Sequence, residues 1–231
     1  MTVEKTKMDR ESLIELIVVI MLGVTALCTA WATWIGALHG GNQATNYTIS
    51  NNQASEGNSE YNAGVQQLNQ DMALWNDISD MQMTILFAQS ADDQLTVDRT
   101  CYQLFYKLDE NLSEGMAQSI GWSYELSPED YNDPTATVLR WLENKSSMKS
   151  PFFNEDYVAA YFTAANDLLA QSQATLEQGR LDNAHGDAFG LVTVIYSVVL
   201  FLLGISSSFN SVKNKYALLA ISLAAFVGAT I

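Results

Sequence analysis

The sequence is poor in cysteine, proline and basic residues, and each shortage excludes a class of structure or partner. Two cysteines among 231 residues cannot make a disulfide framework, and we expect Cys28 and Cys101 to lie at different depths, too far apart to bond. Proline, which interrupts helices, is absent before Pro128. Eleven Lys and Arg stand against 26 Asp and Glu, and this formal net charge of −15 excludes general attraction to nucleic acid.

Motifs of enzyme active sites are missing as well. The chain has no phosphate-binding glycine loop, no H-E-x-x-H, no nucleophile elbow and no Cys/His pair. We therefore expect a protein that is not an enzyme and that holds no cofactor.

Long apolar runs without charge are what the sequence does contain. No Asp, Glu, Lys or Arg occurs in residues 16–55, 188–212 or 216–231. A helix needs about 20 apolar residues to cross a bilayer. The runs predict transmembrane helices at residues 12–38, 188–209 and 216–231, of which the third is short and is expected to be an incomplete span.

Basic residues beside these spans predict the orientation, because Lys and Arg collect on the cytoplasmic side. They place residues 1–11 and the loop 210–215 in the cytoplasm. The residues that carry this argument are Lys5, Lys7, Arg10, Lys213 and Lys215.

Residues 39–187 then form one extracytoplasmic domain, which holds all but four of the acidic residues, 22 against six basic ones. Such a surface attracts cations or a basic partner, or it serves only to keep the domain soluble.

The segment 40–64 has the composition of a flexible linker, yet it keeps a helical register. Aromatic and apolar side chains recur every seven residues through it, at Tyr47, Ala54, Tyr61, Leu68 and Trp75. A second row is predicted at Ala44, Asn51, Asn58, Val65 and Met72. Together the rows alternate by three and four residues, which is typical of a helical seam in a bundle or an oligomer. The first span is therefore expected to continue outward as one helix.

The other half of the chain mirrors this pattern. Residues 154–189 carry a second three-and-four seam that runs toward the second span. Residues 93–120 show one helical stripe, and Asp133 with Pro134 is typical of a helix start. The prediction is an all-α membrane protein in which two long helices continue from the spans into a domain close to a four-helix bundle.

The residues around the end of the first span carry a family resemblance. The stretch "AWATWIGALHGGNQATNY" contains the pattern A-W-x-x-W … G-x-Q-A-x-x-Y, at Ala30, Trp31, Trp34, Gly41, Gln43, Ala44 and Tyr47. It resembles a family of bacterial membrane proteins described only as a domain of unknown function. The resemblance implies a multi-pass protein of the bacterial inner membrane and supplies no activity.

The order of span, helical domain and span is also similar to a bacterial chemoreceptor sensor module. The long cytoplasmic signalling helices of such receptors are absent after the second span, where "NSVKNK" and another apolar run follow. The similarity is therefore one of architecture only.

Threonines recur every four residues in the first span, at Thr25, Thr29 and Thr33. They would line a wet path if several subunits surrounded an axis, with Glu15 forming a carboxylate ring at its inner mouth. The alternative is a packing face, because small residues let helices approach closely and threonine bonds its own backbone. Glu15 is then a carboxylate at a helix start, facing water.

Both histidines are expected near the outer membrane boundary. His39 and His185 each precede a glycine where a span meets its outer helix, and Asp182 and Asp187 lie close in sequence to the second. These four residues are a candidate metal site or pH-responsive cluster. The alternative is that they are solvated side chains at the interface.

The sequence thus predicts a non-enzymatic membrane protein whose acidic outer domain senses, binds or mediates assembly. Its expected partners are membrane lipid, further copies of the same chain and, at the outer domain, cations or a basic protein. Ligand or partner contacts are expected around residues 90–155. The alternative function is a homo-oligomeric ion channel lined by the first span.

The two functions predict different oligomeric states. A channel requires a closed ring of subunits, which mass measurement of the chain in lipid nanodiscs would detect. A monomer in that measurement would eliminate the channel.

Overall fold

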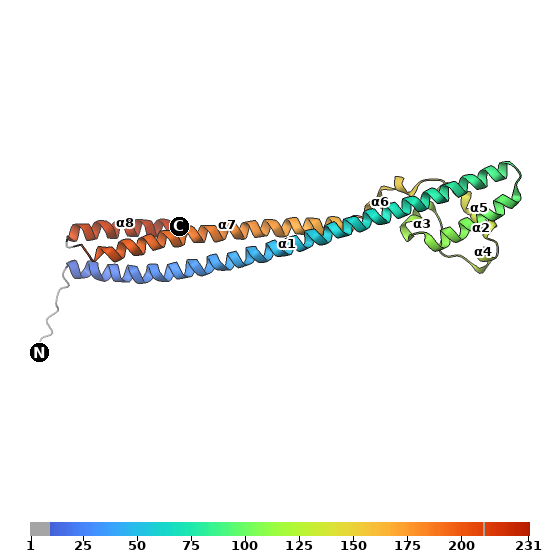
Figure 1. The fold of residues 1–231 in the computed structure, drawn as a ribbon. Helices are drawn as coiled ribbons and strands as arrows, with labels where there is room; N and C mark the ends of the chain where they lie inside the picture. Colours follow the sequence, from blue (N-terminus) through green and yellow to red (C-terminus); the bar gives the residue numbers. More distant parts are fainter. Residues whose placement is uncertain (1–9, 210) are drawn as a thin grey trace. The chain divides into compact units, whose positions relative to one another are not determined.

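The structure, a computed structural model, describes residues 10–209 and 211–231. Lys5, Lys7 and residue 210, which the predicted orientation and loop include, lie outside the described residues. The described elements are all helical, so the predicted all-α class is confirmed. In chain order (Figure 1) they are α1 (Arg10–Ser90), α2 (Gln94–Asn111), α3 (Glu114–Ile120), α4 (Pro128–Asn132), α5 (Pro134–Leu142), the 3-10 helix η1 (Pro151–Phe153), α6 (Glu155–Ala160), α7 (Thr163–Ser206) and α8 (Val212–Thr230).

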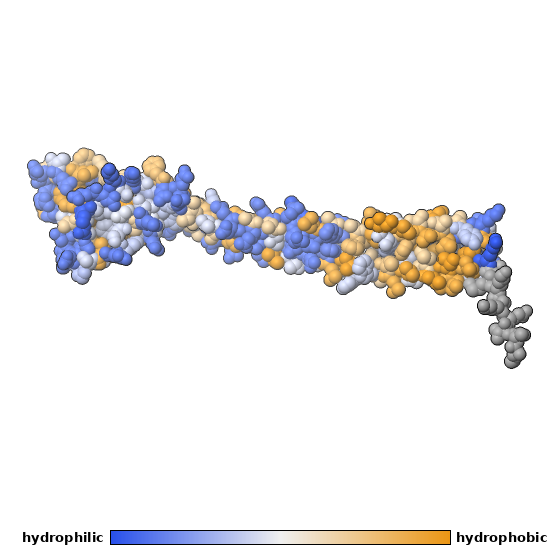
Figure 2. Space-filling view, turned by 180° about the vertical axis from the view of Figure 1, so that it is seen from behind, coloured by the Kyte–Doolittle hydropathy of each residue, from blue (hydrophilic) through white to orange (hydrophobic). Residues whose placement is uncertain are grey.

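Helices α1, α7 and α8 are each long and apolar enough to cross a membrane. Figure 2 shows apolar side chains gathered over the part of the chain that contains the predicted spans, and a mainly hydrophilic surface elsewhere. This agrees with a multi-pass membrane protein, because the hydrocarbon core of a bilayer contains no water to solvate polar groups, so side chains that face lipid are apolar.

The asparagine-rich segment 40–64 is helical throughout and belongs to α1. Three of its hydroxyl side chains bond to carbonyls one turn back: Thr45 to Gly41 O at 3.0 Å, Thr48 to Ala44 O at 2.9 Å and Ser59 to Ser55 O at 3.1 Å. Polar residues that satisfy themselves within the helix need no other fold to hold their hydrogen bonds. The prediction that this segment is helix and not a flexible linker is confirmed.

Contacts divide the chain into two units, of which the first comprises residues up to Asn51 together with Ser172–Ile231. Its apolar core joins α1 to α7 through Ile14, Val18, Val199 and Leu203. Helix α8 is fastened to α7 by a 2.9 Å hydrogen bond between the hydroxyls of Tyr196 and Thr230.

In this first unit α1 and α7 approach closely where both carry small side chains. Ser50 Oγ donates to Ser172 O at 2.8 Å, and Ser172 Oγ donates to Ser50 O, also at 2.8 Å. Gly179 faces the ring of Tyr47 so closely that a Cβ there would lie 2.6 Å from it. Small residues thus set the spacing of the two helices.

The second unit comprises residues 52–171 and shows which side of α1 forms the seam. In the predicted first row Trp75 is buried, and Tyr47, Ala54 and Leu68 are half-buried. Tyr61 is 47% exposed, with its ring centroid 5.0 Å from that of Phe162. The second predicted row does not take part in the packing within this chain: Ala44, Asn51, Asn58 and Met72 are exposed and Val65 is half-buried. The buried row is Ser50, Gly57, Gly64, Asp71, Ile78 and Ile85, again spaced by seven.

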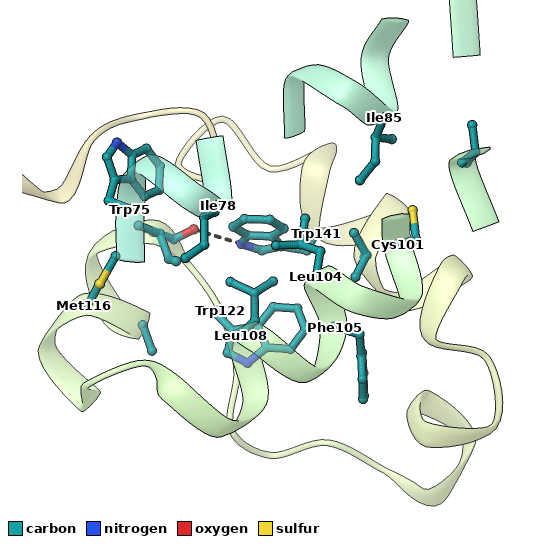
Figure 3. Close-up of a cluster of buried hydrophobic side chains, with 14 of the residues drawn as sticks. Trp75, Ile78, Ile85, Cys101, Leu104, Phe105, Leu108, Met116, Trp122 and Trp141 are labelled. Carbon is teal, nitrogen blue, oxygen red and sulfur yellow. Dashed lines mark hydrogen bonds between the residues drawn. The ribbon is translucent and has the colours of Figure 1, made fainter. Parts of the chain in front are cut away.

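The second unit has its own apolar core, built where α2, α3 and α5 pack against the end of α1 (Figure 3). Leu104, Phe105 and Leu108 of α2 are fully buried in it. Three of the chain's tryptophans, Trp75, Trp122 and Trp141, also belong to this core. Large aromatic side chains of this kind supply most of the apolar area that a small helical domain buries.

Helix boundaries in this unit follow the capping residues. Asp133 caps α5 by accepting from Ala136 N, and Pro134 is its first residue, as predicted. The predicted single helix at 93–120 is divided, because Ser113 adopts an extended conformation and caps a new helix, α3. The predicted helix from residue 154 is also divided, into α6 and α7.

The close approach predicts opposite effects for alanine at two glycines of α1. A Cβ on Gly64 would lie 2.5 Å from the Tyr161 carbonyl oxygen, whereas one on Gly41 meets nothing within 4 Å. We expect Gly64→Ala to lower the free energy of unfolding by about 1–3 kcal/mol through overpacking. Gly41→Ala should leave it unchanged or raise it by up to about 1 kcal/mol, since alanine favours helix.

Thermal unfolding of the full chain in detergent, followed by circular dichroism, measures both variants. Equal melting temperatures for the two would contradict the assigned close approach.

Candidate functional site

The second unit has a cavity of about 220 Å³ between α5 and the loop that follows α3. The helix contributes Thr137, Arg140 and Trp141, whose spacing places them on one face, and Asn144 follows just after its end. The loop contributes Gly121, Trp122, Ser123 and Leu126. All of these residues fall inside the range 90–155 in which the sequence predicted ligand or partner contacts.

Local geometry fixes both walls of the cavity. Gly121 ends α3 in the left-handed conformation, with φ of 70°, and its missing Cβ would lie 2.6 Å from Asn144 Nδ2. Only glycine combines that conformation with that contact at low cost. The chain then turns so that the rings of Trp122 and Trp141 meet edge to face, with centroids 5.8 Å apart.

The two indole N–H groups of this aromatic pair are in different states. Trp141 Nε1 donates to Ile120 O at 3.0 Å. Trp122 is 6% exposed, and its Nε1 is one of three buried side-chain polar atoms in the described residues that lack a hydrogen-bond partner. Leaving such a donor unpaired costs about 1–3 kcal/mol. Trp122 thus lines the cavity, while its N–H is covered and has no acceptor among these protein residues.

Arg140 at the cavity is held by Asp130 through an ion pair. The Asp130 carboxylate also accepts from Ser127 N and Ser127 Oγ, each at 2.8 Å, and from Thr137 Oγ1 at 3.1 Å. These bonds, led by the one from the Ser127 backbone, hold the pKa of Asp130 well below its usual range. These donors hold the Asp130 carboxylate in place, and the carboxylate in turn orients Arg140. A guanidinium has five N–H donors, so N–H groups of Arg140 that Asp130 does not use can donate to a ligand.

A second polar cluster in this unit surrounds the buried carboxylate of Asp71. The hydroxyls of Tyr157 and Tyr161 donate to it, and Gln67 Nε2 does so at 3.0 Å. Burial, followed by the hydrogen bond to Asp71, raises the pKa of both phenols. No sequence motif marks this cluster, because Asp71 is one of 22 acidic residues in 39–187.

In the first unit the structure brings together three of the four predicted metal-site residues. His39 Nδ1 lies 3.0 Å from Asp182 Oδ1, and the ring centroids of His39 and His185 lie 5.0 Å apart. Asn46 donates to the other oxygen of Asp182 at 2.9 Å. Asp182 is 5% exposed, so this cluster is a buried polar link between α1 and α7.

Asp187, the fourth predicted residue, is exposed and accepts from Asn183 at 3.1 Å. Within residues 10–209 and 211–231 there is no group of three or more His, Cys, Asp or Glu side chains arranged to hold a metal ion. The metal hypothesis therefore gains no support from the geometry.

The predicted threonine stripe does not share one environment. Thr25 is fully buried by helices of the same chain, Thr29 is half-buried and Thr33 is exposed. Thr29 and Thr33 each bond to the carbonyl four residues earlier, as the packing alternative expects. Glu15 is exposed and pairs with Lys215 Nζ at 3.0 Å.

Comparisons with known proteins give no further guide. No protein-family model matches the chain, and no curated protein or solved structure is significantly similar to it. The resemblance carried by Trp31, Trp34 and the following motif stays a prediction.

The Asp71 cluster predicts a specific loss of stability on substitution. Asp71→Asn removes the charge that accepts from two phenols, so we expect the free energy of unfolding to fall by about 1.5–3 kcal/mol at neutral pH. Asp77→Asn is the matched control, because Asp77 is 60% exposed and its pair with Lys107 lies at the surface. The control should change stability by less than about 1 kcal/mol.

The same cluster predicts an alkaline transition. A phenol whose pKa is raised on folding stabilises the fold fully below the unfolded pKa, about 10, and this contribution is lost as pH rises above it. Unfolding free energy should therefore fall above about pH 10, and it should fall less steeply in Tyr157→Phe. Identical alkaline profiles for that variant and the wild type would contradict the buried position of Tyr157.

Proposed function

We infer that this protein is a membrane-anchored, non-enzymatic receptor whose second unit binds a small carboxylate outside the cytoplasm. The observation that carries the proposal is a cavity lined by Arg140, Asn144 and Trp122, of which the last has a covered N–H without an acceptor. A donor without an acceptor favours a ligand that brings one, and the covered Trp122 N–H meets that acceptor when the indole turns toward the cavity.

The composition of the cavity supports a narrow ligand class. Its charged and amide groups are donors toward a ligand, which suits a carboxylate or carbonyl oxygen. Two indole rings and Leu126 supply apolar surface for the remainder of the molecule. The volume of about 220 Å³ is below the roughly 300–1,000 Å³ of drug-sized sites, so the ligand is small.

The proposed orientation rests on the basic residues beside the spans. Lys213 and Lys215 lie in the first turn of α8, at the end of this candidate span that follows α7, and the positive-inside rule assigns this end to the cytoplasm. Residues 39–187, and with them the cavity, then lie on the outer side of a bacterial inner membrane. Helices α1 and α7 each contain residues of a candidate span and residues of the second unit without a break. This continuity supports a role in reporting ligand binding to the membrane.

No observation favours the channel alternative in the same way. Thr25 is covered by its own chain, and the charge of Glu15 is met by Lys215.

The receptor proposal predicts saturable binding of small carboxylates with an apolar body. The full chain in nanodiscs is titrated with benzoate, phenylacetate and isovalerate and with their amides, and tryptophan fluorescence and melting temperature are recorded. We expect at least one carboxylate to stabilise the wild type. Its affinity should fall by about 5- to 150-fold in Trp122→Phe and in Arg140→Gln, corresponding to about 1–3 kcal/mol.

Trp34→Phe is the matched control. Trp34 is exposed in the first unit, so this substitution removes one indole without changing the cavity. It should bind as the wild type does. Equal affinity in Trp122→Phe and Trp34→Phe would overturn the assignment of the cavity, and no response to any carboxylate would overturn the ligand class.

A further inference from the structure

The first unit contains a separate cavity of about 420 Å³ where α1 begins and α7 ends. Ile14, Val18 and Leu203, all buried core residues, form its apolar floor. Val19 lines it as well and is 65% exposed, so the cavity opens to the outer surface of the helices. Both helices are candidate membrane spans, and we therefore expect this opening to face lipid.

One side of the opening is polar. Lys215 is 5% exposed, and its Nζ lies 2.9 Å from Glu11 Oε1 and 3.0 Å from Glu15 Oε1. Glu15 and Lys215 both line the cavity. These three groups carry one excess negative charge, and an ammonium has three donors of which the two carboxylates use two.

We propose that this cavity binds one phospholipid whose headgroup carries a primary amine, as phosphatidylethanolamine does. The acyl chain lies against Val18, Val19 and Leu203, where burying each CH₂ group is favourable. The headgroup ammonium donates to the exposed oxygens of Glu11 and Glu15, and the lipid phosphate accepts the remaining N–H of Lys215.

Charge and hydrogen-bond chemistry select this headgroup over the other common ones. A choline headgroup carries a positive charge but no N–H to donate to Glu15. A glycerol headgroup leaves the phosphate charge unbalanced beside two carboxylates, which repel it. The site therefore prefers phosphatidylethanolamine to phosphatidylcholine, and both to phosphatidylglycerol.

Gly204 gives a direct way to close the cavity. It lines the cavity, and a Cβ built on it meets nothing within 4 Å. Gly190 lies on the same helix, also meets nothing within 4 Å and does not line the cavity. Gly204→Leu therefore fills the acyl-chain space, and Gly190→Leu adds the same side chain elsewhere on α7.

The test is native mass spectrometry of the full chain, purified in mild detergent and exchanged into an equimolar mixture of phosphatidylethanolamine and phosphatidylcholine with identical acyl chains. We expect one retained lipid per chain in the wild type and in Gly190→Leu, with about fivefold preference for phosphatidylethanolamine. Gly204→Leu should retain about tenfold less lipid. Glu15→Gln should retain lipid but lose the headgroup preference.

Gel filtration and circular dichroism show whether each variant is folded. If Gly204→Leu does not fold, the headgroup preference of Glu15→Gln tests the proposal. Equal retention by the two leucine variants overturns the proposal, as does equal retention of the two lipids by the wild type. A second copy of the chain in place of lipid, seen as a dimer mass that Gly204→Leu abolishes, also overturns it. None of these outcomes bears on the carboxylate cavity of the second unit.

Discussion

The pairing of α1 with α7 depends on positions where almost no side chain separates the two backbones. Glycine and serine supply these positions every seventh residue along α1, from Ser50 through Gly57 to Gly64. Small residues add little apolar area, but they allow many weak contacts at short range and direct hydrogen bonds between the helices. Larger side chains on the neighbouring row then cover the contact from the side, as Tyr47 covers Gly179.

Structural features that depend on one segment of the sequence alone were predicted well. The apolar runs identify three helices of spanning length, and the Asp133–Pro134 start of α5 follows from local capping chemistry. The buried row through Gly57 and Gly64 was not predicted, because the seam was inferred from aromatic and apolar side chains, whereas close packing selects for small volume. The break at Ser113 was missed because an apolar stripe continues across it.

Both cavities lie beyond what the sequence predicts, since each depends on residues distant along the chain. The first joins the loop at 121–126 to a face of α5, and the second joins the start of α1 to the end of α7. Neither group has a motif. Each cavity is instead recognised by a polar group. In the first it is the Trp122 N–H, which has no acceptor, and in the second it is the Lys215 ammonium, of whose three N–H donors Glu11 and Glu15 use two. Polar groups in such settings are costly unless something satisfies them.

The reciprocal bonds between Ser50 and Ser172 have a mechanical consequence for the first unit. Each hydroxyl reaches the other helix's backbone, so a displacement of α1 along α7 breaks both bonds together. The next equivalent register lies a full helical turn, about 5.4 Å, away. Piston-like travel between these two helices is thereby opposed, while rotation about the serine contact keeps both bonds short. A signal that crosses this pair would take the form of a twist or a scissoring motion.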